Sequence, residues 1–214
     1  MKIVSLITAR GGSKSVPLKN IIDINGKPLI WYSINASLNS NVNETWVSTE
    51  DSKIKTVSIE CGAKVIDRPK ELADDIIMPD ASILHFAENV DFDLVVFIQP
   101  TSPMIKPEYI NEGIQKVIDK GYDSSFAVVR EHWTPTWIAT KRPHPIGWDI
   151  NNRPRRQDRS DIYREAGMFY VTKREHLLKS KLRYSGKIGP VEIPVKDGVD
   201  INTIEDIDLV RKLL

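Results

Sequence analysis

Hydrophobic residues follow two alternating patterns along this chain. Short apolar runs of β-strand character occupy residues 2–9, 44–49, 63–66, 93–100 and 124–131. Between them, apolar residues recur at helical spacing over residues 28–40, 51–62, 80–90 and 107–121. The run LVVFI at 94–98 is apolar on both faces, which is typical of a strand covered by helices on both sides. The alternation predicts βαβ units and a doubly wound, mostly parallel α/β sheet.

The alternation stops between residues 132 and 163. This stretch contains three tryptophans, several prolines and the run NNRPRRQDRSD, and it shows no helical period. We interpret it as an inserted β-hairpin arm or lid. A segment of this size that is rich in Trp and Pro is expected to pack on a partner subunit.

The α/β pattern resumes after the insertion. The expected elements are a strand at 167–173, a helix at 174–180, a strand at 191–195 and a final amphipathic helix within 202–214. Asn202 or Thr203 is expected to cap that helix. We therefore predict one domain over residues 1–214, with the arm inserted at about 132–163.

Composition narrows the class of protein further. The 214 residues are 41% apolar and 28% charged, with a formal net charge of +1, which disfavours disorder, a membrane span or a nucleic-acid-binding surface. The single cysteine excludes an internal disulfide and a cysteine-based zinc site, and the four histidines lack metal-ligand spacing. Because the apolar run after Met1 is too short for a signal-peptide core, we expect a cytoplasmic protein.

The stretch ITARGGSKSVPLKN, residues 7–20, follows the first predicted strand. In open α/β folds, phosphate groups bind at the carboxyl ends of strands. Gly11 and Gly12 can direct backbone N–H groups at one anion, while Arg10, Lys14 and Lys19 supply positive charge. The spacing matches neither GxGxxG nor the P-loop, so the residues alone leave a solvated turn open as the alternative.

The longer string ARGGSKSVPLKNI resembles the phosphate loop of the CMP-sialic acid synthetases, or acylneuraminate cytidylyltransferases. This family includes the enzymes that activate legionaminic and pseudaminic acids. Further matches follow in the same order: DRPKELADD at 67–75, IQPTSP at 98–103, RRQD at 155–158, YREAGMFYV at 163–171 and GVDINTIEDIDL at 198–209. The resemblance implies a nucleotidyltransferase that joins CTP to a 2-keto-3-deoxy sugar acid for cell-surface polysaccharides. It also implies release of pyrophosphate, use of Mg²⁺, with Mn²⁺ as the alternative metal, and assembly as a homodimer.

The resemblance also assigns substrate contacts. Arg10, Ser13 and Lys19 would hold the triphosphate together with Gly11 and Gly12, Asn20 would lie near the ribose or base, Arg68 beside the cytosine, Gln99 at the sugar, and Arg156 and Arg164 at anionic groups of the substrates. Guanidinium groups suit carboxylates and phosphates because they donate in a planar fork. The alternatives are a salt bridge from Arg68 to Glu71 or Asp74, and a solvated face for the arginine-rich run.

The motif near residue 200 resembles the metal site of the family. Asp200 matches its first carboxylate, and Asn202 stands where the second carboxylate is expected, so these two residues are the predicted metal ligands. Arg10, Lys19 and Asp200 are the predicted catalytic groups. Ala166 replaces an Asn that is frequent in the sialic acid enzymes, which leaves the identity of the sugar open. No general base is evident, although His132 and His144 are candidates.

Two other functions fit the sequence less well. One is a related nucleotidyltransferase acting on a Kdo-type octulosonate or on a sugar 1-phosphate. The other is a nucleotide-binding protein without catalysis, which the change to Asn202 suggests.

Overall fold

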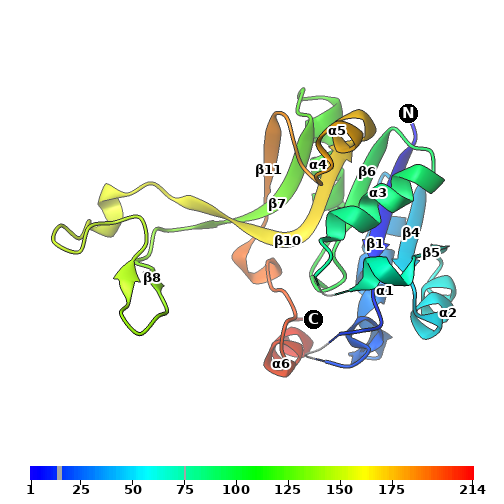
Figure 1. Cartoon of the computed structure of the whole chain (residues 1–214), viewed down its shortest axis with the longest axis horizontal. Helices are drawn as coiled ribbons and strands as arrows, with labels where there is room; N and C mark the ends of the chain where they lie inside the picture. The colour runs from blue at the N-terminus through cyan, green and yellow to red at the C-terminus, as the bar shows by residue number, and fades with distance from the viewer. Residues whose placement is uncertain (14–15, 75) are drawn as a thin grey trace.

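A computed structural model describes residues 1–13, 16–74 and 76–214 of the chain. Within these residues, a seven-stranded sheet has the strand order β11-β7-β10-β6-β1-β4-β5 (Figure 1). Its strands are β1 (Ile3–Thr8), β4 (Glu44–Thr49), β5 (Lys64–Asp67), β6 (Leu94–Ile98), β7 (Ser124–Glu131), β10 (Ile162–Lys173) and β11 (Ile188–Glu192). In this sheet β10 is antiparallel to both of its neighbours and the other strand pairs are parallel, which confirms the predicted mostly parallel α/β sheet.

Helices cover both faces of the sheet, as the doubly apolar strands predict. They are α1 (Leu29–Leu38), α2 (Ser52–Glu60), α3 (Pro79–Asn89), α4 (Pro107–Ile118), α5 (Arg174–Ser180) and α6 (Ile204–Leu213). One core cluster joins the sheet to α1, α2 and α4, and a second joins it to α3 and α5. In α4, Ile110, Ile114 and Val117 are buried at helical spacing and Pro107 occupies the first turn, where its missing N–H costs no hydrogen bond.

The four adjacent parallel strands end together at one edge of the sheet. Ile7 lies opposite Ile98 of β6, Thr8 lies opposite Ser48 of β4, and Thr49 lies opposite Asp67 of β5. The segments that follow these strands are therefore neighbours, although they are far apart in the sequence. They carry the loop from Arg10, the residues Glu50 and Arg68, and Gln99.

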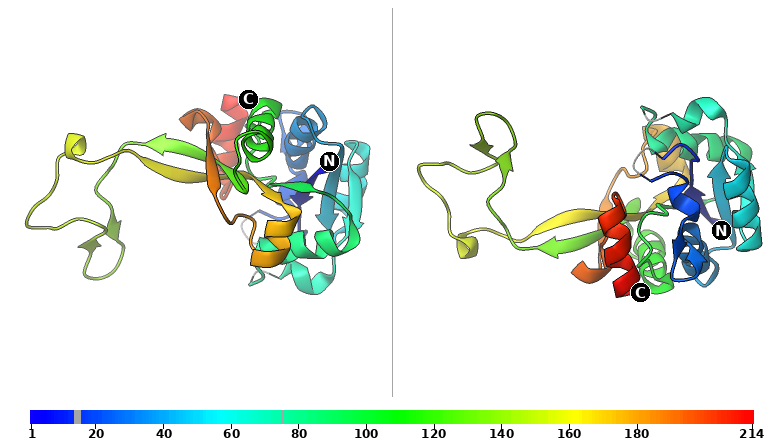
Figure 2. Two further views of the ribbon diagram at one scale, coloured as in Figure 1. Left: turned by 90° about the horizontal axis from the view of Figure 1, so that it is seen from above. Right: turned by 90° about the horizontal axis from the view of Figure 1, so that it is seen from below.

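The predicted insertion is an arm that projects from the sheet (Figures 1 and 2). Its stem consists of β7 and β10, and beyond it lies a small hairpin of β8 (Trp137–Ile138) and β9 (His144–Pro145). The indole rings of Trp137 and Trp148 meet edge to face, with their centroids 5.1 Å apart. β10 begins at Ile162, five residues before the predicted start at 167, because residues 162–165 pair with the end of β7.

Two other boundaries differ from the predictions. The expected strand at 191–195 is β11 at Ile188–Glu192, because it follows the edge of β7. Of the two predicted caps, Thr203 is the one that caps α6: its hydroxyl accepts from Asp206 N–H, and the Asp206 carboxylate accepts from Thr203 N–H. In the part of the chain that the structure describes, no helix combines the length and the apolar character needed to cross a membrane.

Two short strands complete the described structure next to the first loop. They are β2 (Asp23–Ile24) and β3 (Lys27–Pro28), which form an antiparallel pair beside α6. A small third core cluster, which includes Val16, Ile24, Ile201 and Ile207, joins this pair to α6. The amino-terminal loop and the carboxyl-terminal segment are therefore packed against each other.

Candidate functional site

A cavity of about 330 Å³ lies at the carboxyl edge of β1, β5 and β6. Its walls include six of the predicted site residues: Arg10, Ser13, Lys19, Asn20, Arg68 and Gln99. The rest of the lining consists of residues around the start of α3 and of Thr8, Leu72, Asp74, Pro100 and Thr101. The fold thus brings three separate motifs of the sequence to one concave surface, where ligands of open α/β sheets are expected.

The first loop is held by its own side chains and by α2. Asn20 is buried, and its Nδ2 donates to the carbonyl of Arg10 at 2.9 Å. A Cβ on Gly11 would lie 2.6 Å from the Asp51 carboxylate, which caps α2, so only glycine fits there. Gly12 is exposed, with open space where a Cβ would be. Lys14, a predicted cation of this loop, lies outside the described residues.

Glu50 joins the loop to the predicted cytosine arginine. Its Oε1 accepts from the Gly11 N–H at 2.7 Å, and its Oε2 accepts from Arg68 Nη2 at 2.6 Å. The Arg68 side chain is only 5% exposed, and its Nη1 also donates to Ser82 at 3.3 Å. The alternative partners Glu71 and Asp74 for Arg68 were therefore wrong. The Gly11 N–H, expected to face phosphate, is instead directed at a carboxylate.

Sequence reasoning missed Glu50. It directly follows β4 and is flanked by the helix cap Asp51, so it has the appearance of a second capping carboxylate. Its position at the end of a predicted parallel strand was the available signal, because such ends line the ligand crevice of this fold class.

Lys19 connects the loop to the predicted metal segment. Its Nζ donates to the carbonyl of Ile201 at 2.8 Å. Burial lowers the pKa of Lys19, the nearby Asp200 charge opposes this shift, and the Arg10 charge adds to it. The ammonium group is therefore partly desolvated beside both a carboxylate and a second cation, an environment that favours an additional anion.

The predicted metal ligands lie next to each other. Asp200 Oδ2 accepts from the amide Nδ2 of Asn202 at 2.9 Å, whereas Asp200 Oδ1 is buried and has no hydrogen-bond partner among the described residues. Those residues contain no group of three or more His, Cys, Asp or Glu arranged to hold a metal. Mg²⁺ is commonly bound by one or two carboxylates together with substrate phosphates. The orphaned oxygen of Asp200 fits that pattern, and Asn202 would have to turn its amide oxygen inward to contribute.

Gln99 lies at the end of β6 on the cavity wall. Its backbone N–H donates to Met168 O at 3.0 Å, and its Oε1 lies 3.2 Å from where a Cβ on Gly167 would be. Gly167 has a φ of +65°, so glycine is favoured there for both space and backbone angle. Ala166 is only 4% exposed and packs in the core. The change from Asn to Ala at this position therefore leaves a small apolar side chain next to Gly167 and Gln99.

Comparison with known proteins adds the family. A family profile described as Cytidylyltransferase matches residues 4–188. The chain belongs to the cytidylyltransferase family. It is 38% identical over 213 residues to N-acylneuraminate cytidylyltransferase A of Danio rerio, covering 96% of this chain and 49% of that relative. It is 30% identical over 223 residues to a pseudaminic acid cytidylyltransferase of Campylobacter jejuni, covering 100% of this chain and 96% of that relative.

Solved structures support the same fold for this cytidylyltransferase family member. A CMP:2-keto-3-deoxy-manno-octonic acid synthetase complexed with CTP has a TM-score of 0.75 at 22% identity, covering 100% of this chain and 98% of that chain. The zebrafish N-acylneuraminate cytidylyltransferase is a longer protein, and the chain spans about half of its length. The family resemblance expected from the motifs is thereby confirmed.

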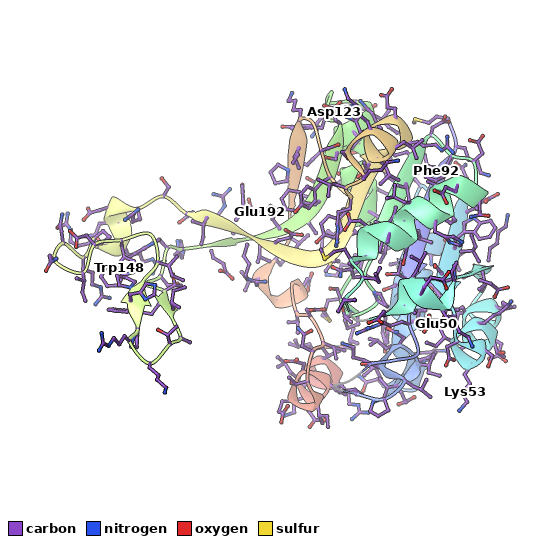
Figure 3. The ribbon with its side chains drawn as sticks, viewed as in Figure 1. Glu50, Lys53, Phe92, Asp123, Trp148 and Glu192 are labelled. Atoms are coloured by element: carbon purple, nitrogen blue, oxygen red, sulfur yellow. The ribbon has the colours of Figure 1, made fainter. Side chains whose placement is uncertain are left out.

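Two predicted site residues of this family member lie on the arm instead of the cavity. Arg156 begins a 3-10 turn, Arg156–Asp158, and Arg164 pairs with Glu131 across β10 and β7 at 2.6 Å. Figure 3 shows Trp148 in the arm, well apart from Glu50 near the first loop. Within one chain the structure therefore does not bring these arginines to the cavity. The candidate bases are also arm residues: His132 pairs with Asp161 at 2.8 Å, and His144 begins β9.

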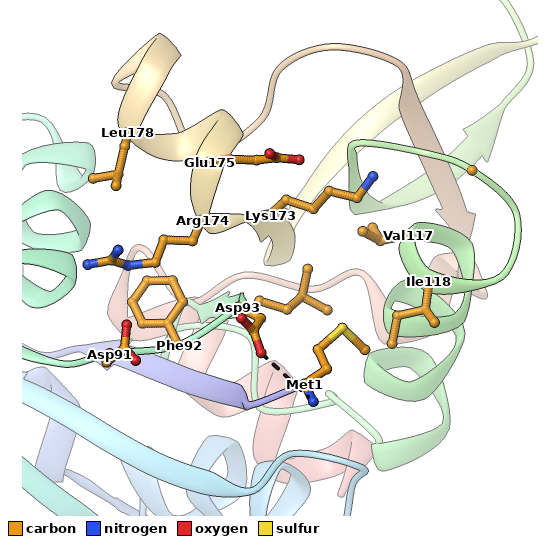
Figure 4. Close-up of a pocket in the computed structure, with 12 residues that line it drawn as sticks. Met1, Asp91, Phe92, Asp93, Val117, Ile118, Lys173, Arg174, Glu175 and Leu178 are labelled. Atoms are coloured by element: carbon orange, nitrogen blue, oxygen red, sulfur yellow. Dashed lines mark ion pairs between the residues drawn. The ribbon is translucent and has the colours of Figure 1, made fainter.

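A larger cavity, of about 840 Å³, lies at the opposite edge of the sheet (Figure 4). It is lined by residues at the amino ends of β1 and β6, including Met1, Phe92 and Asp93, and by Arg174 at the start of α5. None of the family motifs contributes to it. The cavity beside the first loop is the better candidate site, because the charged and polar side chains predicted to bind substrate meet there.

Removal of the Glu50 carboxylate is expected to destabilise the cytidylyltransferase fold. Glu50→Ala would leave the buried Arg68 guanidinium without its ion partner, which costs about 3–5 kcal/mol in comparable buried pairs. Chemical denaturation of wild type and variant measures the difference. Asp67→Ala, which removes an exposed pair with Lys55, is the matched control and should change stability by about 0.5 kcal/mol or less. Equal losses in both variants would contradict the role given to Glu50.

Proposed function

We propose that this protein is a cytidylyltransferase that activates an acidic sugar with CTP. The acceptor is a 2-keto-3-deoxy sugar acid of the sialic, legionaminic or pseudaminic type, and the products are the CMP-sugar and pyrophosphate. The observation that carries the proposal is the convergence of Arg10, Lys19 and Arg68 with Gln99 on one cavity. The names of the relatives from zebrafish and Campylobacter jejuni support the same reaction.

The residues of the cavity suit a displacement at phosphorus. A hydroxyl of the sugar would attack the α-phosphorus of CTP, the bond from that phosphorus to the bridging oxygen would break, and pyrophosphate would leave. Such transfer depends mainly on in-line positioning and on positive charge at the phosphates. Arg10 and Lys19, with Ser13 and the exposed backbone at Gly12, would supply that charge and those donors.

Arg68 would select the base. A guanidinium group can donate to O2 and N3 of cytosine, whereas the N3–H of uracil would oppose a second donor. Glu50 supports this role because its pair with Arg68 fixes the guanidinium plane at the wall of the cavity. Gln99, which can both donate and accept, would face the acceptor sugar.

Asp200, with the amide oxygen of Asn202, would hold Mg²⁺, or Mn²⁺, together with phosphate oxygens of CTP. The cation would supply positive charge at the α-phosphate and lower the pKa of the attacking hydroxyl. The fold of this chain holds the Asp200 carboxylate beside Lys19, so that the metal and the lysine would bind the same phosphates.

The arm supports a homodimer in which each subunit lends Arg156 to its partner's site. Trp137, Ile146 and Ile150 are exposed on it, and a partner surface would cover them. Sedimentation velocity is expected to show a dimer at micromolar concentration. Mixing Arg156→Ala subunits with Lys19→Met subunits should restore part of the activity, since one site of the mixed dimer would be intact. A monomer with full activity would contradict this arrangement.

Pyrophosphate release tests the function directly. Wild-type protein is assayed with each of three nucleotides, CTP, UTP and GTP. The acceptors are nonulosonic acids, octulosonic acids and sugar 1-phosphates, and each combination is tested first with Mg²⁺ and then with Mn²⁺. Turnover is expected with CTP and a nonulosonic acid. Preference for an octulosonic acid would instead favour the Kdo-type alternative. The CMP:2-keto-3-deoxy-manno-octonic acid synthetase, which has the same fold as this chain, is named for a substrate of that type. No release with any acceptor would favour a nucleotide-binding protein. The single cysteine, which cannot form an internal disulfide, supports a cytoplasmic location.

A further inference from the structure

A buried carboxylate lies three residues before Asp200. Asp197 has no exposed surface, and its Oδ2 accepts hydrogen bonds from Lys106 Nζ at 2.8 Å and from Tyr109 OH at 2.5 Å. Its Oδ1 is also buried, without a hydrogen-bond partner among the described residues. Both donors belong to the start of α4, about ninety residues earlier in the chain, at sequence separations of 91 and 88. None of the functional motifs assigns a role to this cluster.

The segment from Asp197 to Ile201 is fixed at both ends. Asp197 anchors its start on α4, and the Ile201 N–H donates to Thr101 O at 2.8 Å in the loop after β6. Between them, a Cβ on Gly198 would lie 2.7 Å from Val129 of β7, so the backbone packs directly on the base of the arm. The Ile201 carbonyl accepts from Lys19 at the same time. Asp200 is thus held between two anchors only four residues apart.

We propose that Asp197, together with Tyr109 and Lys106, is a positioning group that sets Asp200 for binding of the metal–nucleotide complex. The inference rests on the proposed function of Asp200. A metal-binding oxygen must be placed to within about 0.5 Å, which requires hydrogen bonds and packing from the residues around the metal-binding side chain. Asp200 has one buried, unpartnered oxygen, so its own hydrogen bonds do not provide all of that support.

The energetics of Asp197 favour a rigid anchor. Burial opposes its ionised form, but the hydrogen bonds from Lys106 and Tyr109 prevail and lower the pKa of Asp197. A buried carboxylate that loses a partner is costly, because the remaining charge stays desolvated. The segment therefore has little freedom to move while both donors are in place, and greater freedom when either is removed.

The test uses two variants of the full chain, each with a matched control that contacts α4 or lies on it. Tyr109→Phe removes only the hydroxyl donor, and Ser125→Ala removes a buried hydroxyl that donates to Gly113 O of α4 at 2.8 Å. Lys106→Met removes the ammonium donor, and Lys116→Met removes an α4 lysine paired with Glu112. Mn²⁺ binding in the presence of CTP is measured by electron paramagnetic resonance, alongside the Mg²⁺ concentration for half-maximal turnover and the melting temperature.

Both cluster variants are expected to weaken Mn²⁺ binding by about three- to tenfold and to raise the Mg²⁺ requirement by a similar factor. At saturating Mg²⁺, turnover should recover to within about twofold of wild type, because the catalytic groups are intact. The controls should bind Mn²⁺ like wild type even where they lower the melting temperature. Wild-type Mn²⁺ affinity in Tyr109→Phe, or an equal loss in Ser125→Ala, would overturn the proposal.

The experiment distinguishes a failure of the Asp197 positioning role from a failure of the proposed function. Mn²⁺ and CTP binding are read without an acceptor, so they report on the site even if the true sugar is absent from the panel. If wild-type protein binds CTP with Mn²⁺ and the cluster variants do not weaken it, the positioning role of Asp197 fails alone. If wild-type protein binds neither CTP nor Mn²⁺, the proposed function fails and the inference falls with it.

Discussion

Asp200→Ala is expected to lower kcat for pyrophosphate release by about a thousandfold at saturating CTP. The variant removes the carboxylate whose orphaned oxygen would hold the metal beside the phosphates. Asn202 cannot compensate, because its amide carries no charge. Turnover is followed by a coupled pyrophosphate assay across a range of Mg²⁺ concentrations, with calorimetry to measure CTP binding without metal.

The matched control for this variant is Asp208→Ala. Asp208 is an exposed carboxylate of α6 whose only recorded ion partner in the described structure is Arg211, at 3.5 Å. It should retain activity within about twofold of wild type, because exposed pairs contribute little energy. Metal-free CTP binding should also be unchanged or slightly stronger in Asp200→Ala, since a negative charge near the phosphates is removed. Full activity in Asp200→Ala would show that the metal is held elsewhere.

Arg10→Ala is expected to lower kcat/KM for CTP by about a hundredfold or more. Arg10 lines the cavity in the loop after β1, and its charge contributes to the lowered pKa of Lys19. The two cations therefore lie close enough to bind the same phosphates. Its carbonyl is fixed by Asn20, which keeps the start of the side chain in place. Initial rates at varied CTP and fixed sugar acid separate the effects on KM and kcat. A larger loss in kcat than in CTP affinity would indicate that Arg10 acts mainly on the transition state.

Arg10→Lys provides the conservative comparison. It keeps the charge but loses the planar fork of donors, so it is expected to recover only about a tenth of the lost activity or less. Arg211→Ala, on α6, removes an exposed arginine with a backbone contact to Asp23 and should leave kcat/KM nearly unchanged. If Arg10→Ala were no worse than Arg211→Ala, the first loop would not be the phosphate site.

Much of the site could be located from motifs and strand ends. Arg10, Lys19 and Gln99 follow predicted strands, and parallel strands that are neighbours end at one edge of a sheet. Their meeting in one cavity was therefore foreseeable once the α/β alternation was recognised. The arm was also foreseeable as a break in that alternation, although its long β10 stem was not. Pairing with β7 extends that strand, and pairing is not visible in local periodicity.

Partners of individual charges were not foreseeable. The alternative considered for Arg68 was a pair within its own turn, yet its partner is Glu50 directly after β4, because β4 and β5 are adjacent and end in register. Asp197 likewise has the appearance of a surface acid in the sequence, but it is buried under the start of α4. The burial of Ala166 in the core, where the register of β10 is irregular, was not foreseeable either, because strand pairing decides it.

The class of fold, the order of most elements and the residue types available for chemistry follow from the chain's own pattern, because periodicity and turn residues act over short distances. The pairing of Glu50 with Arg68, the anchoring of the Asp200 segment on α4 and the distance of the arm arginines from the cavity depend on contacts between residues far apart in the chain. Such contacts arise only when strand order and register are established, since these decide which side chains become neighbours and which lose water.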